Sequence, residues 1–315
     1  MRLAEVINAS READCAWEHP ETPHSVEMRI RHGWDGEPGE WFLASTPELG
    51  TVGHLAVFLS TYDNLDSAWL WLTVLPSLRR RGLGSDLLHA AADVCRGLGR
   101  SLVGIAGWEE AHPEGFAAAH GFEEKSRAIL RRLTVADVDP DRIDVLHDEV
   151  AHHAADYLLE RYDGAMPESL LPALSELTGV INDAPLDDLE LEDEQFPPER
   201  IRAYEHAQLA SGFRLRRVLA RHRGTGELAG HTVVAVDSTR PWIGDQHDTA
   251  VARDHRGHRL GLLLKTDMLR WLREEEPALA TIDTFNAESN DHMVGVNERL
   301  GYRIMARELV YQRRI

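Results

Sequence analysis

The sequence predicts an α/β protein built from two similar halves, and three observations support this fold class. Each half has several strand-like apolar runs followed by an amphipathic helix that opens after an arginine- and glycine-rich stretch. These stretches, "PSLRRRGLGSDLL" at 76–88 and "RDHRGHRLGLLLK" at 253–265, place Arg79 and Arg256 177 positions apart. "GF" at 121–122 and "GY" at 301–302 form a second pair, at a spacing of 180. Two landmarks at nearly equal offset favour an internal duplication over a coincidence between two α/β elements.

The first half begins with polar helical material at about 10–34, interrupted by "HPETPHS". Apolar runs at 40–45, 51–60 and 67–75, separated by turn-rich segments, predict three strands. After Pro76 the apolar period becomes helical and ends near Gly97. A strand at 101–107, a short helix around 114–120 and a strand near 128–135 complete this half.

The second half repeats this order from about residue 136. A long helical and acidic region at 141–212 precedes strands at 213–222, 227–237 and 245–252. The second glycine-containing stretch opens a helix that runs to about Glu275, and a strand at 280–286, a helix and a final strand follow. We therefore expect two domains, residues 1–135 and 136–315.

Composition limits the partners that the chain can have. Its formal net charge of −19 argues against nucleic acid or an anionic membrane surface and favours small cationic molecules such as amines. No apolar run reaches the ~18 residues of a membrane span. Cys15 and Cys95 have neither metal-ligand nor disulfide-framework spacing, and the N-terminal residues are polar. We expect a cytoplasmic protein without a metal.

The repeated stretch has the physical features of an anion site. The first N–H groups of a helix have no intrahelical acceptor and carry the positive end of the helix dipole. Glycines allow a phosphate to approach the backbone, and arginines add positive charge. A pyrophosphate is the simplest ligand, although a solvated helix N-terminus is the alternative reading of the same residues.

At this point the chain resembles a known family. "VLPSLRRRGLG" at 74–84 is similar to the acetyl-CoA signature of the GCN5-related N-acetyltransferases, Arg/Gln-x-x-Gly-x-Gly/Ala, with Arg79, Gly82 and Gly84 at its three places. The order of strands and helices also resembles that family, in both halves. The resemblance implies a tandem arrangement like that of mycothiol synthase, in which each domain is a mixed, mostly antiparallel sheet flanked by helices. No motif links the chain to that enzyme's own substrate.

The resemblance implies that acetyl-CoA is the cosubstrate and that the signature amides hold its pyrophosphate. In the second copy Arg256 and Gly261 match, but Arg259 stands where the middle glycine belongs. We expect Arg259 to adopt an ordinary helical backbone and to add charge, so that binding is kept; a strained loop that requires φ > 0 there would argue against binding. The residues expected to bind the cofactor are Val74, Arg79, Arg80, Arg81, Gly82, Leu83 and Gly84 in the first copy, and Val251, Ala252, Arg256, Gly257, His258, Arg259, Leu260, Gly261 and Asn286 in the second.

Family positions also indicate which half is catalytic. Some members use a Glu eleven places before the signature as a general base; that place is Asp245 in the second copy and Ala68 in the first. The alternative for Asp245 is a solvent-facing residue in the turn "IGDQHD". Asn290 falls where the family has an Asn, eleven residues before Gly301. Asn297 takes the place of the family's Tyr acid, where the first copy has Ala117. We expect Asp245, Asn290 and Asn297 to be catalytic and the N-terminal half to be structural or an inert CoA binder.

The sequence therefore predicts an acetyl-CoA-dependent N-acetyltransferase acting on a small amine by direct transfer in a ternary complex. The alternative is a CoA-binding pseudoenzyme that acts as a sensor or interaction module, which the missing Tyr and the imperfect second signature favour. A nucleotide-binding Rossmann protein fits less well, because its glycine-rich loop should follow the first strand of a βαβ unit. The acceptor, the acyl length and the oligomeric state stay open.

Overall fold

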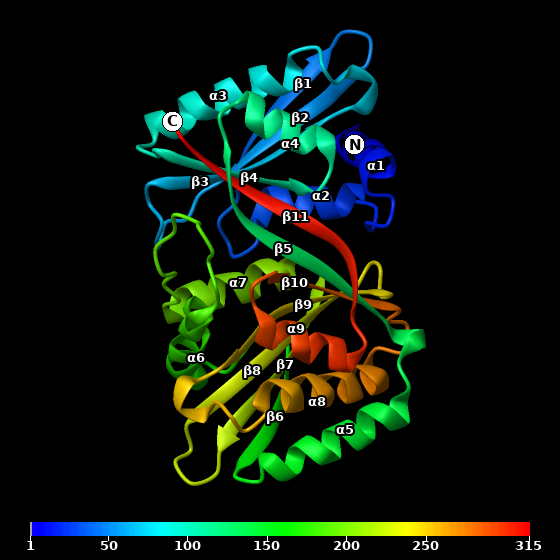
Figure 1. The fold of residues 1–315 in the computed structure, drawn as a ribbon, viewed down its shortest axis with the longest axis vertical. Coiled ribbons are helices and arrows are strands. Elements are labelled where there is room, and N and C mark those ends of the chain that lie inside the picture. Colours follow the sequence, from blue (N-terminus) through cyan, green and yellow to red (C-terminus); the bar gives the residue numbers. More distant parts are fainter. Residues whose placement is uncertain (1) are drawn as a thin grey trace. The chain divides into compact units, whose positions relative to one another are not determined.

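The computed structural model of the chain describes residues 2–315, which form two compact units (Figure 1). Unit 1 contains the residues up to Arg127, Leu186–Asp193 and Arg307–Ile315; unit 2 contains Ala128–Pro185 and Glu194–Ala306. These units differ from a division after residue 135, because residues 128–135 lie in unit 2 and residues 307–315 in unit 1. Strands β5 (Glu123–Thr134) and β11 (Arg303–Arg314) therefore each contribute residues to both units.

Unit 1 has a sheet in the order β1-β2-β3-β4-β11. Its strands are β1 (Glu40–Thr46), β2 (Gly50–Phe58), β3 (Ser67–Val74) and β4 (Leu102–Trp108), joined by the C-terminal part of β11. Its helices are α1 (Arg2–Asp14), α2 (Pro23–His32), α3 (Leu83–Gly97) and α4 (Ala111–Ala119). Helices α1 and α2 pack with Trp41 and Trp71 in one apolar cluster, whereas Leu88 of α3 packs with Leu55 and Leu70 in another. Two helical layers thus enclose the sheet.

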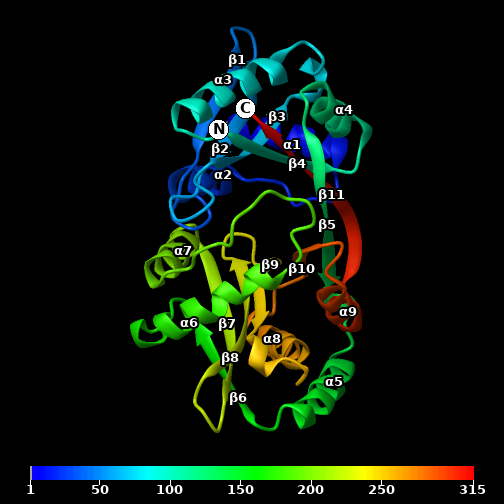
Figure 2. The same ribbon diagram turned by 60° about the vertical axis from the view of Figure 1, so that its left-hand side comes forward.

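Unit 2 repeats this plan with the sheet order β5-β10-β9-β8-β7-β6. The strands are β6 (Tyr157–Asp163), β7 (Phe213–His222), β8 (Leu228–Asp237), β9 (Ile243–Val251) and β10 (Thr281–Ala287), with the end of β5. The helices are α5 (Pro140–His153), α6 (Leu171–Thr178), α7 (Pro198–Ala210), α8 (Leu260–Glu275) and α9 (Asp291–Leu300). Within unit 2, Figure 2 shows α8 on one face of the β7–β9 strands and α6 and α7 on the other.

The predicted fold class is confirmed. Each sheet is mixed and mostly antiparallel, with a parallel pair where a helix connects two strands, β3–β4 in unit 1 and β9–β10 in unit 2. The sequence did not predict β6, which lies in the region expected to be helical. This strand is at the sheet edge, and its charged residues Glu160 and Arg161 interrupt the apolar run, so that no strand pattern is visible in the sequence.

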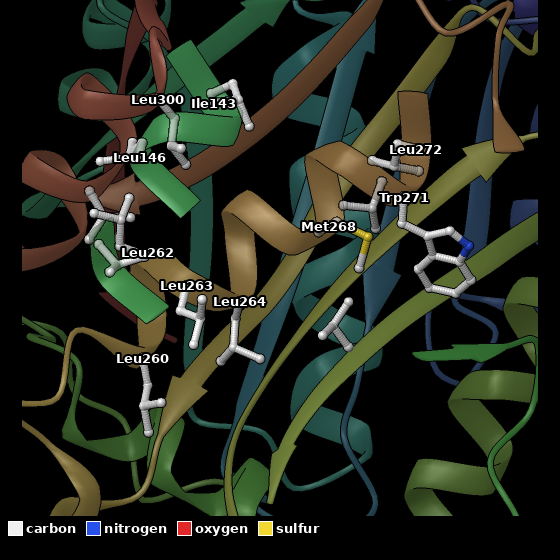
Figure 3. Close-up of a cluster of buried hydrophobic side chains, with 14 of the residues drawn as sticks. Ile143, Leu146, Leu260, Leu262, Leu263, Leu264, Met268, Trp271, Leu272 and Leu300 are labelled. Carbon is white, nitrogen blue, oxygen red and sulfur yellow. The ribbon is translucent and has the colours of Figure 1, made fainter. Parts of the chain in front are cut away.

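The core of unit 2 lies under α8. Leu264 and Met268 are fully buried against Val218, Val234 and other β7–β8 residues (Figure 3). Because α8 begins directly after the second signature stretch, this packing holds the N-terminus of the helix in place at the end of β9. The duplication extends into the cores: His54 of β2 and His231 of β8 are again 177 positions apart, and neither is exposed.

Candidate functional site

The site of unit 2 starts where β9 and β10 separate. Their parallel ladder runs from Thr281–Ile243 to Thr284–Gln246, and both strands continue beyond that last pair, β9 to Val251 and β10 to Ala287. Because a strand edge without a ladder leaves backbone N–H and C=O groups to be satisfied by another partner, the opening suits an extended ligand with amide groups.

A β-bulge in β9 marks the start of this opening. Thr232 of β8 pairs with Thr249, and Val234 pairs with Gln246, so that one residue of β8 faces His247 and Asp248 together. A bulge bends its strand and increases the local twist, which turns the end of β9 away from β10. Along the described residues of β2 and β3 in unit 1, the register from Gly53–Val74 to Phe58–Trp69 has no such shift.

Asp245 lies at the closed end of the opening. It is opposite Asp283 on β10 and opposite Ala235 on β8. Ala235 packs with Tyr204 of α7, so the register places the Asp245 side chain on the face that α6 and α7 cover. Burial, with the nearby Asp283 carboxylate, raises the pKa of Asp245 to about 7. Asp283 itself forms a paired contact with Arg132, at 2.6 and 2.7 Å.

His247 occupies the bulge and contacts α7. Its Nδ1 is 2.5 Å from the hydroxyl of Tyr204. Burial, with the charge of Arg217, lowers the pKa of His247 to about 3, and burial raises the pKa of Tyr204. The imidazole is therefore neutral, and the tyrosine hydroxyl and Nδ1 share one hydrogen bond. No local sequence pattern links these two residues, which are 43 positions apart.

The two signature loops have the same backbone conformation. Arg80 and Gly82 have φ of 62° and 90°; at the equivalent positions 177 residues later, Gly257 and Arg259 have φ of 87° and 56°. In both loops a left-handed residue, one other residue and a second left-handed residue lead into the helix. Successive N–H groups in such turns converge to form a concave anion site. A Cβ built on Gly257 or Gly261 meets no heavy atom within 4 Å, so the loop mouth is open.

The expectation that Arg259 would use a helical backbone is wrong. Arg259 is left-handed, with φ 56° and ψ 23°, because the loop requires this conformation at the position that Gly82 holds in unit 1. An L-residue pays ~1–2 kcal/mol there. The loop geometry is nevertheless kept, and the Arg259 guanidinium lies 3.0 Å from Glu149 on α5.

The first arginine of each signature braces its loop. Nε of Arg79 donates to the carbonyl of Val74 at 3.1 Å, and Nε of Arg256 donates to that of Val251 at 3.2 Å. The Arg79 guanidinium also binds both oxygens of Asp14 on α1, at 2.8 and 2.6 Å. Burial opposes ionisation of Asp14, yet the hydrogen bond and charge of Arg79 lower its pKa.

Asp183 plays the corresponding part in unit 2. It ends the short 3₁₀ turn Gly179–Asp183 and receives hydrogen bonds from Arg253 and Arg256, which hold its pKa well below the usual range. It lies in the tract "INDAP" at 181–185, where this turn follows α6. The sequence did not indicate that its carboxylate would hold the signature arginine.

In unit 1 an indole fills the place where β3 and β4 separate. Their ladder ends at Leu70–Ile105, and Trp69 pairs with Gly104. A Cβ on Gly104 would lie 2.4 Å from the Trp69 ring, so the ring rests directly on the glycine. Ala68, eleven places before Arg79, packs in the core beneath α3. Eleven residues before its signature, each strand therefore presents a different face of its sheet: Asp245 faces α6 and α7, whereas Ala68 faces α3. The difference arises because β3 lacks the extra residue of the β9 bulge.

The three asparagines lie on β10 and α9. Asn290 caps α9 by accepting from the N–H of Met293 at 3.2 Å. Asn297 has no exposed surface; its Oδ1 accepts from Nζ of Lys265 at 2.6 Å, and its Nδ2 donates to Oδ1 of Asn286 at 2.7 Å. Asn286 is half-buried and follows Thr284, the last residue of the β9–β10 ladder, by two positions.

Lys265 is a further candidate residue that was not predicted from the sequence. It lies within the run "LGLLLKTDML" of α8 and is 2% exposed. Burial lowers its pKa to about 7. The signal was present in the sequence, because a lysine within an unbroken apolar run is a candidate for burial.

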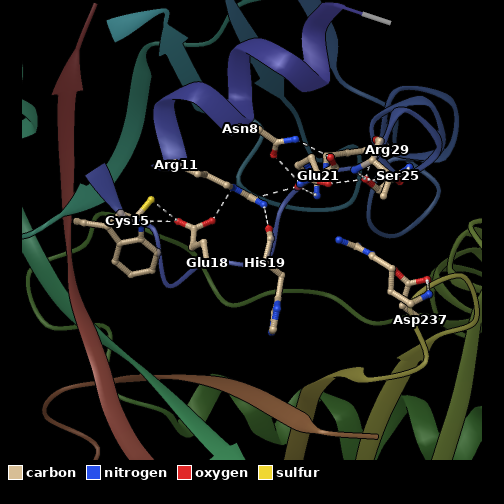
Figure 4. A network of polar contacts seen from close by, with 12 residues as sticks. Asn8, Arg11, Cys15, Glu18, His19, Glu21, Ser25, Arg29 and Asp237 are labelled. Carbon is tan, nitrogen blue, oxygen red and sulfur yellow. Dashed lines mark hydrogen bonds and ion pairs between the residues drawn. The ribbon is translucent and has the colours of Figure 1, made fainter. Parts of the chain in front are cut away.

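In unit 1, the segment between α1 and α2 is held by ion pairs (Figure 4). Arg11 contacts Glu18 at 2.7 Å and Glu21 at 3.0 Å, and Glu21 also contacts Arg29 at 2.9 Å. Despite its burial, the charges of Arg29 and Arg11 lower the pKa of Glu21 to about 2. This network orders the wall above the unit 1 sheet.

Within residues 2–315, no group of three or more His, Cys, Asp or Glu side chains is arranged to hold a metal ion. The histidines at 147, 152 and 153 on α5 therefore belong to no such group. Across the same described range, no helix has the length and apolar character needed to span a bilayer.

Comparisons with known proteins agree with this geometry. The sequence profile of the acetyltransferase (GNAT) family matches residues 7–124 and 184–302. A solved tandem GNAT protein from the clavulanic acid biosynthesis pathway, in a form without AcCoA, is 26% identical, with 99% of this chain and 94% of that chain covered and a TM-score of 0.83. A GCN5-related N-acetyltransferase from Sphaerobacter thermophilus is 15% identical over 99% and 91% of the chains, with a TM-score of 0.69, which shows the fold alone. No curated protein matches.

Proposed function

Because the chain belongs to the acetyltransferase (GNAT) family, we propose that it transfers an acetyl group from acetyl-CoA to the amine of a small molecule, and that unit 2 carries out the reaction. Membership establishes the broader class, an acyl-CoA N-acyltransferase. The position of Asp245 supports the proposed acetyl transfer in unit 2 most strongly: it lies at the closed end of the β9–β10 opening, and its pKa is raised to about 7.

The loop and the opening fit the two ends of acyl-CoA. The N–H groups of Gly257 to Gly261 would bind the pyrophosphate, since the loop is concave and open there. The unpaired edge of β9 beyond Gln246 would pair with the pantetheine amides. Arg256 supports the loop through Val251 and Asp183, and Arg259 adds charge at its mouth.

Asp245 would act as the general base. An alkylamine is mostly protonated near neutral pH, and a carboxylate with a pKa near 7 can accept its proton, directly or through one water. The free amine then attacks the thioester carbonyl and a C–N bond forms. The nitrogen releases its second proton to solvent, and the C–S bond breaks as the thiolate leaves. CoA thiol has an ordinary thiol pKa, so solvent can protonate the thiolate. The net charge of −19 favours a cationic acceptor.

Unit 1 would support the fold and would not catalyse the reaction. Its loop keeps the anion-binding conformation, but its strand lacks the bulge, and Trp69 lies over Gly104 where the strands separate. An acyl chain that entered there would meet an indole instead of a carboxylate.

The test is release of CoA thiol from acetyl-CoA with a panel of primary amines, using wild type, Asp245→Asn and Asp93→Asn. Asp93 is the matched control, because it is an exposed carboxylate on α3 of unit 1. We expect turnover with at least one amine, a loss of 100-fold or more in Asp245→Asn, and a change below threefold in Asp93→Asn. Tight acetyl-CoA binding with no turnover above hydrolysis would instead support the pseudoenzyme alternative.

A further inference from the structure

Lys265, Asn297 and Asn286 form a continuous hydrogen-bonded chain from the core of unit 2 to the edge of the β9–β10 opening. Nζ of Lys265 donates to Asn297 at 2.6 Å, and Asn297 donates to Asn286 at 2.7 Å. Solvent exposure rises along this series of hydrogen bonds: Lys265 is 2% and Asn297 0% exposed, whereas Asn286 on β10 is half-buried. Nζ also lies 5.2 Å from the ring centre of Tyr302.

Unit 1 shows that the fold does not need these polar groups. The positions equivalent to Lys265, Asn297 and Tyr302 are Leu88, Ala117 and Phe122, and all three pack in the unit 1 core. Burying an ammonium is unfavourable, whereas the apolar set in unit 1 fills the same places without that penalty. The polar set therefore calls for a function in unit 2.

The direction of the hydrogen bonds indicates what that function is. An ammonium has only donors, so Lys265 forces Asn297 to present its oxygen inward and its Nδ2 toward Asn286. Asn286 must then accept with Oδ1, which leaves its own Nδ2–H groups for the opening. Each donor in such a series is polarised by the one behind it, and the positive charge of Lys265 strengthens the last N–H.

We propose that Lys265 is a positioning residue for acyl transfer, which holds Asn286 through Asn297 so that the Asn286 amide N–H stabilises the departing thiolate of CoA. This rests on the proposed function of unit 2. Asn286 lies two residues beyond the last β9–β10 pair, on the same edge that receives the pantetheine. As the C–S bond breaks, the electron pair stays on sulfur; Asn286 donates a hydrogen bond to it, and solvent supplies the proton.

The charge of Lys265 gives the proposal a pH dependence. Its pKa of about 7 means that the ammonium, and the polarisation it provides, is lost as the pH rises through neutrality. The titratable group that faces it is Tyr302, whose pKa is raised by burial and by Asp283, so it stays neutral throughout this range. Asp283 itself pairs with Arg132.

The chain offers a direct readout, because Lys125 and Lys265 are its two lysines. Labelling lysine Cε with ¹³C gives two NMR signals, and Lys265→Leu identifies which belongs to Lys265. We expect the Lys265 signal to titrate near pH 7 and to shift when CoA is added, while the Lys125 signal stays in place. Binding of CoA, confirmed by calorimetry, without a shift of the Lys265 signal would overturn the proposal.

The kinetic test uses Lys265→Leu/Asn297→Ala, which copies the unit 1 pair and should fold, as its melting temperature at pH 6 will show. We expect kcat to fall 10- to 100-fold and the Kd for acetyl-CoA to change less than twofold. In wild type, kcat should decline above pH 7 as the Lys265 ammonium is lost, and this decline should be absent in the variant. Unchanged kcat and an unchanged pH profile would overturn the proposal. If wild type acylates no amine yet CoA shifts the Lys265 signal, the proposed function fails while the link between Lys265 and the CoA site stands; no CoA binding overturns both.

Discussion

Gly82 and Arg259 hold the same left-handed backbone conformation at equivalent positions of the two signature loops. Their φ angles are 90° and 56°, and each residue directly precedes the first residue of its helix. An arginine thus takes a conformation that glycine adopts without strain, and the loop shape survives the exchange. The strain lies at a site expected to bind a ligand, which is where strained backbone residues concentrate.

Arg259→Gly should therefore stabilise unit 2. Removing the Cβ relieves the left-handed strain, and we expect the unfolding free energy to rise by ~1 kcal/mol. The lost contact with Glu149 is exposed and contributes little. Thermal unfolding of Arg259→Gly beside Arg259→Ala checks this, because alanine loses the charge but keeps the strain. Equal melting temperatures for the two variants would contradict the prediction.

Asp183→Asn should weaken acetyl-CoA binding in unit 2. Asp183 holds Arg256, and Arg256 supports the end of β9 through Val251. Loss of this support should cost ~1 kcal/mol, about a fivefold increase in Kd by calorimetry. If Arg256 instead contacts the phosphates directly, removing its competing carboxylate would tighten binding, and that result would exclude the bracing role.

The raised pKa of Asp245 predicts how stability changes with pH. Its pKa is about 7 in the folded protein and near 3.8 when unfolded, so protonation favours folding. The contribution of Asp245 to stability is therefore full below a pH of about 3.8 and is lost progressively as the pH rises from there through about 7. Asp245→Asn cannot ionise, so its melting temperature should exceed that of wild type at pH 8 and match it near pH 4. A constant difference across this range would place the pKa elsewhere.

Gly104→Ala should destabilise unit 1 and spare catalysis. The added methyl group would lie 2.4 Å from the Trp69 ring, and such overpacking typically costs ~1–3 kcal/mol. The melting transition should fall, while kcat at a temperature where the protein stays folded should change less than twofold. A large loss of kcat in the folded variant would assign a catalytic part to unit 1.

The sequence was a good guide where its signals are local. Apolar periodicity located every strand except β6, and the spacing of Arg79 and Arg256 revealed the duplication. The signals failed where tertiary structure decides. The left-handed φ of Arg259 follows from the loop as a whole, the bulge at His247 changes which face a residue count reaches, and neither is visible in residue types.

Side-chain partners distant in sequence were equally hidden. Asp183 is 73 positions from Arg256, and Lys265 is 32 positions from Asn297, so no local pattern joins them. Asn290 and Asn297 were chosen by family position, yet the structure gives Asn290 a helix-capping contact and buries Asn297 completely. Residues 128–135 and 307–315 lie in the opposite unit from the one expected, because tertiary contacts and not the order of the chain decide the unit boundaries.

The most direct test of the central claim, that unit 2 is the catalytic unit, is acetyl-CoA-dependent thiol release with an accepted amine, measured for Arg256→Glu and Arg79→Glu. Each substitution replaces the first signature arginine of one unit by a carboxylate. We predict that Arg256→Glu abolishes turnover and that Arg79→Glu keeps more than half of the wild-type rate. Loss of turnover in Arg79→Glu with activity kept in Arg256→Glu would contradict this prediction and move the reaction to unit 1.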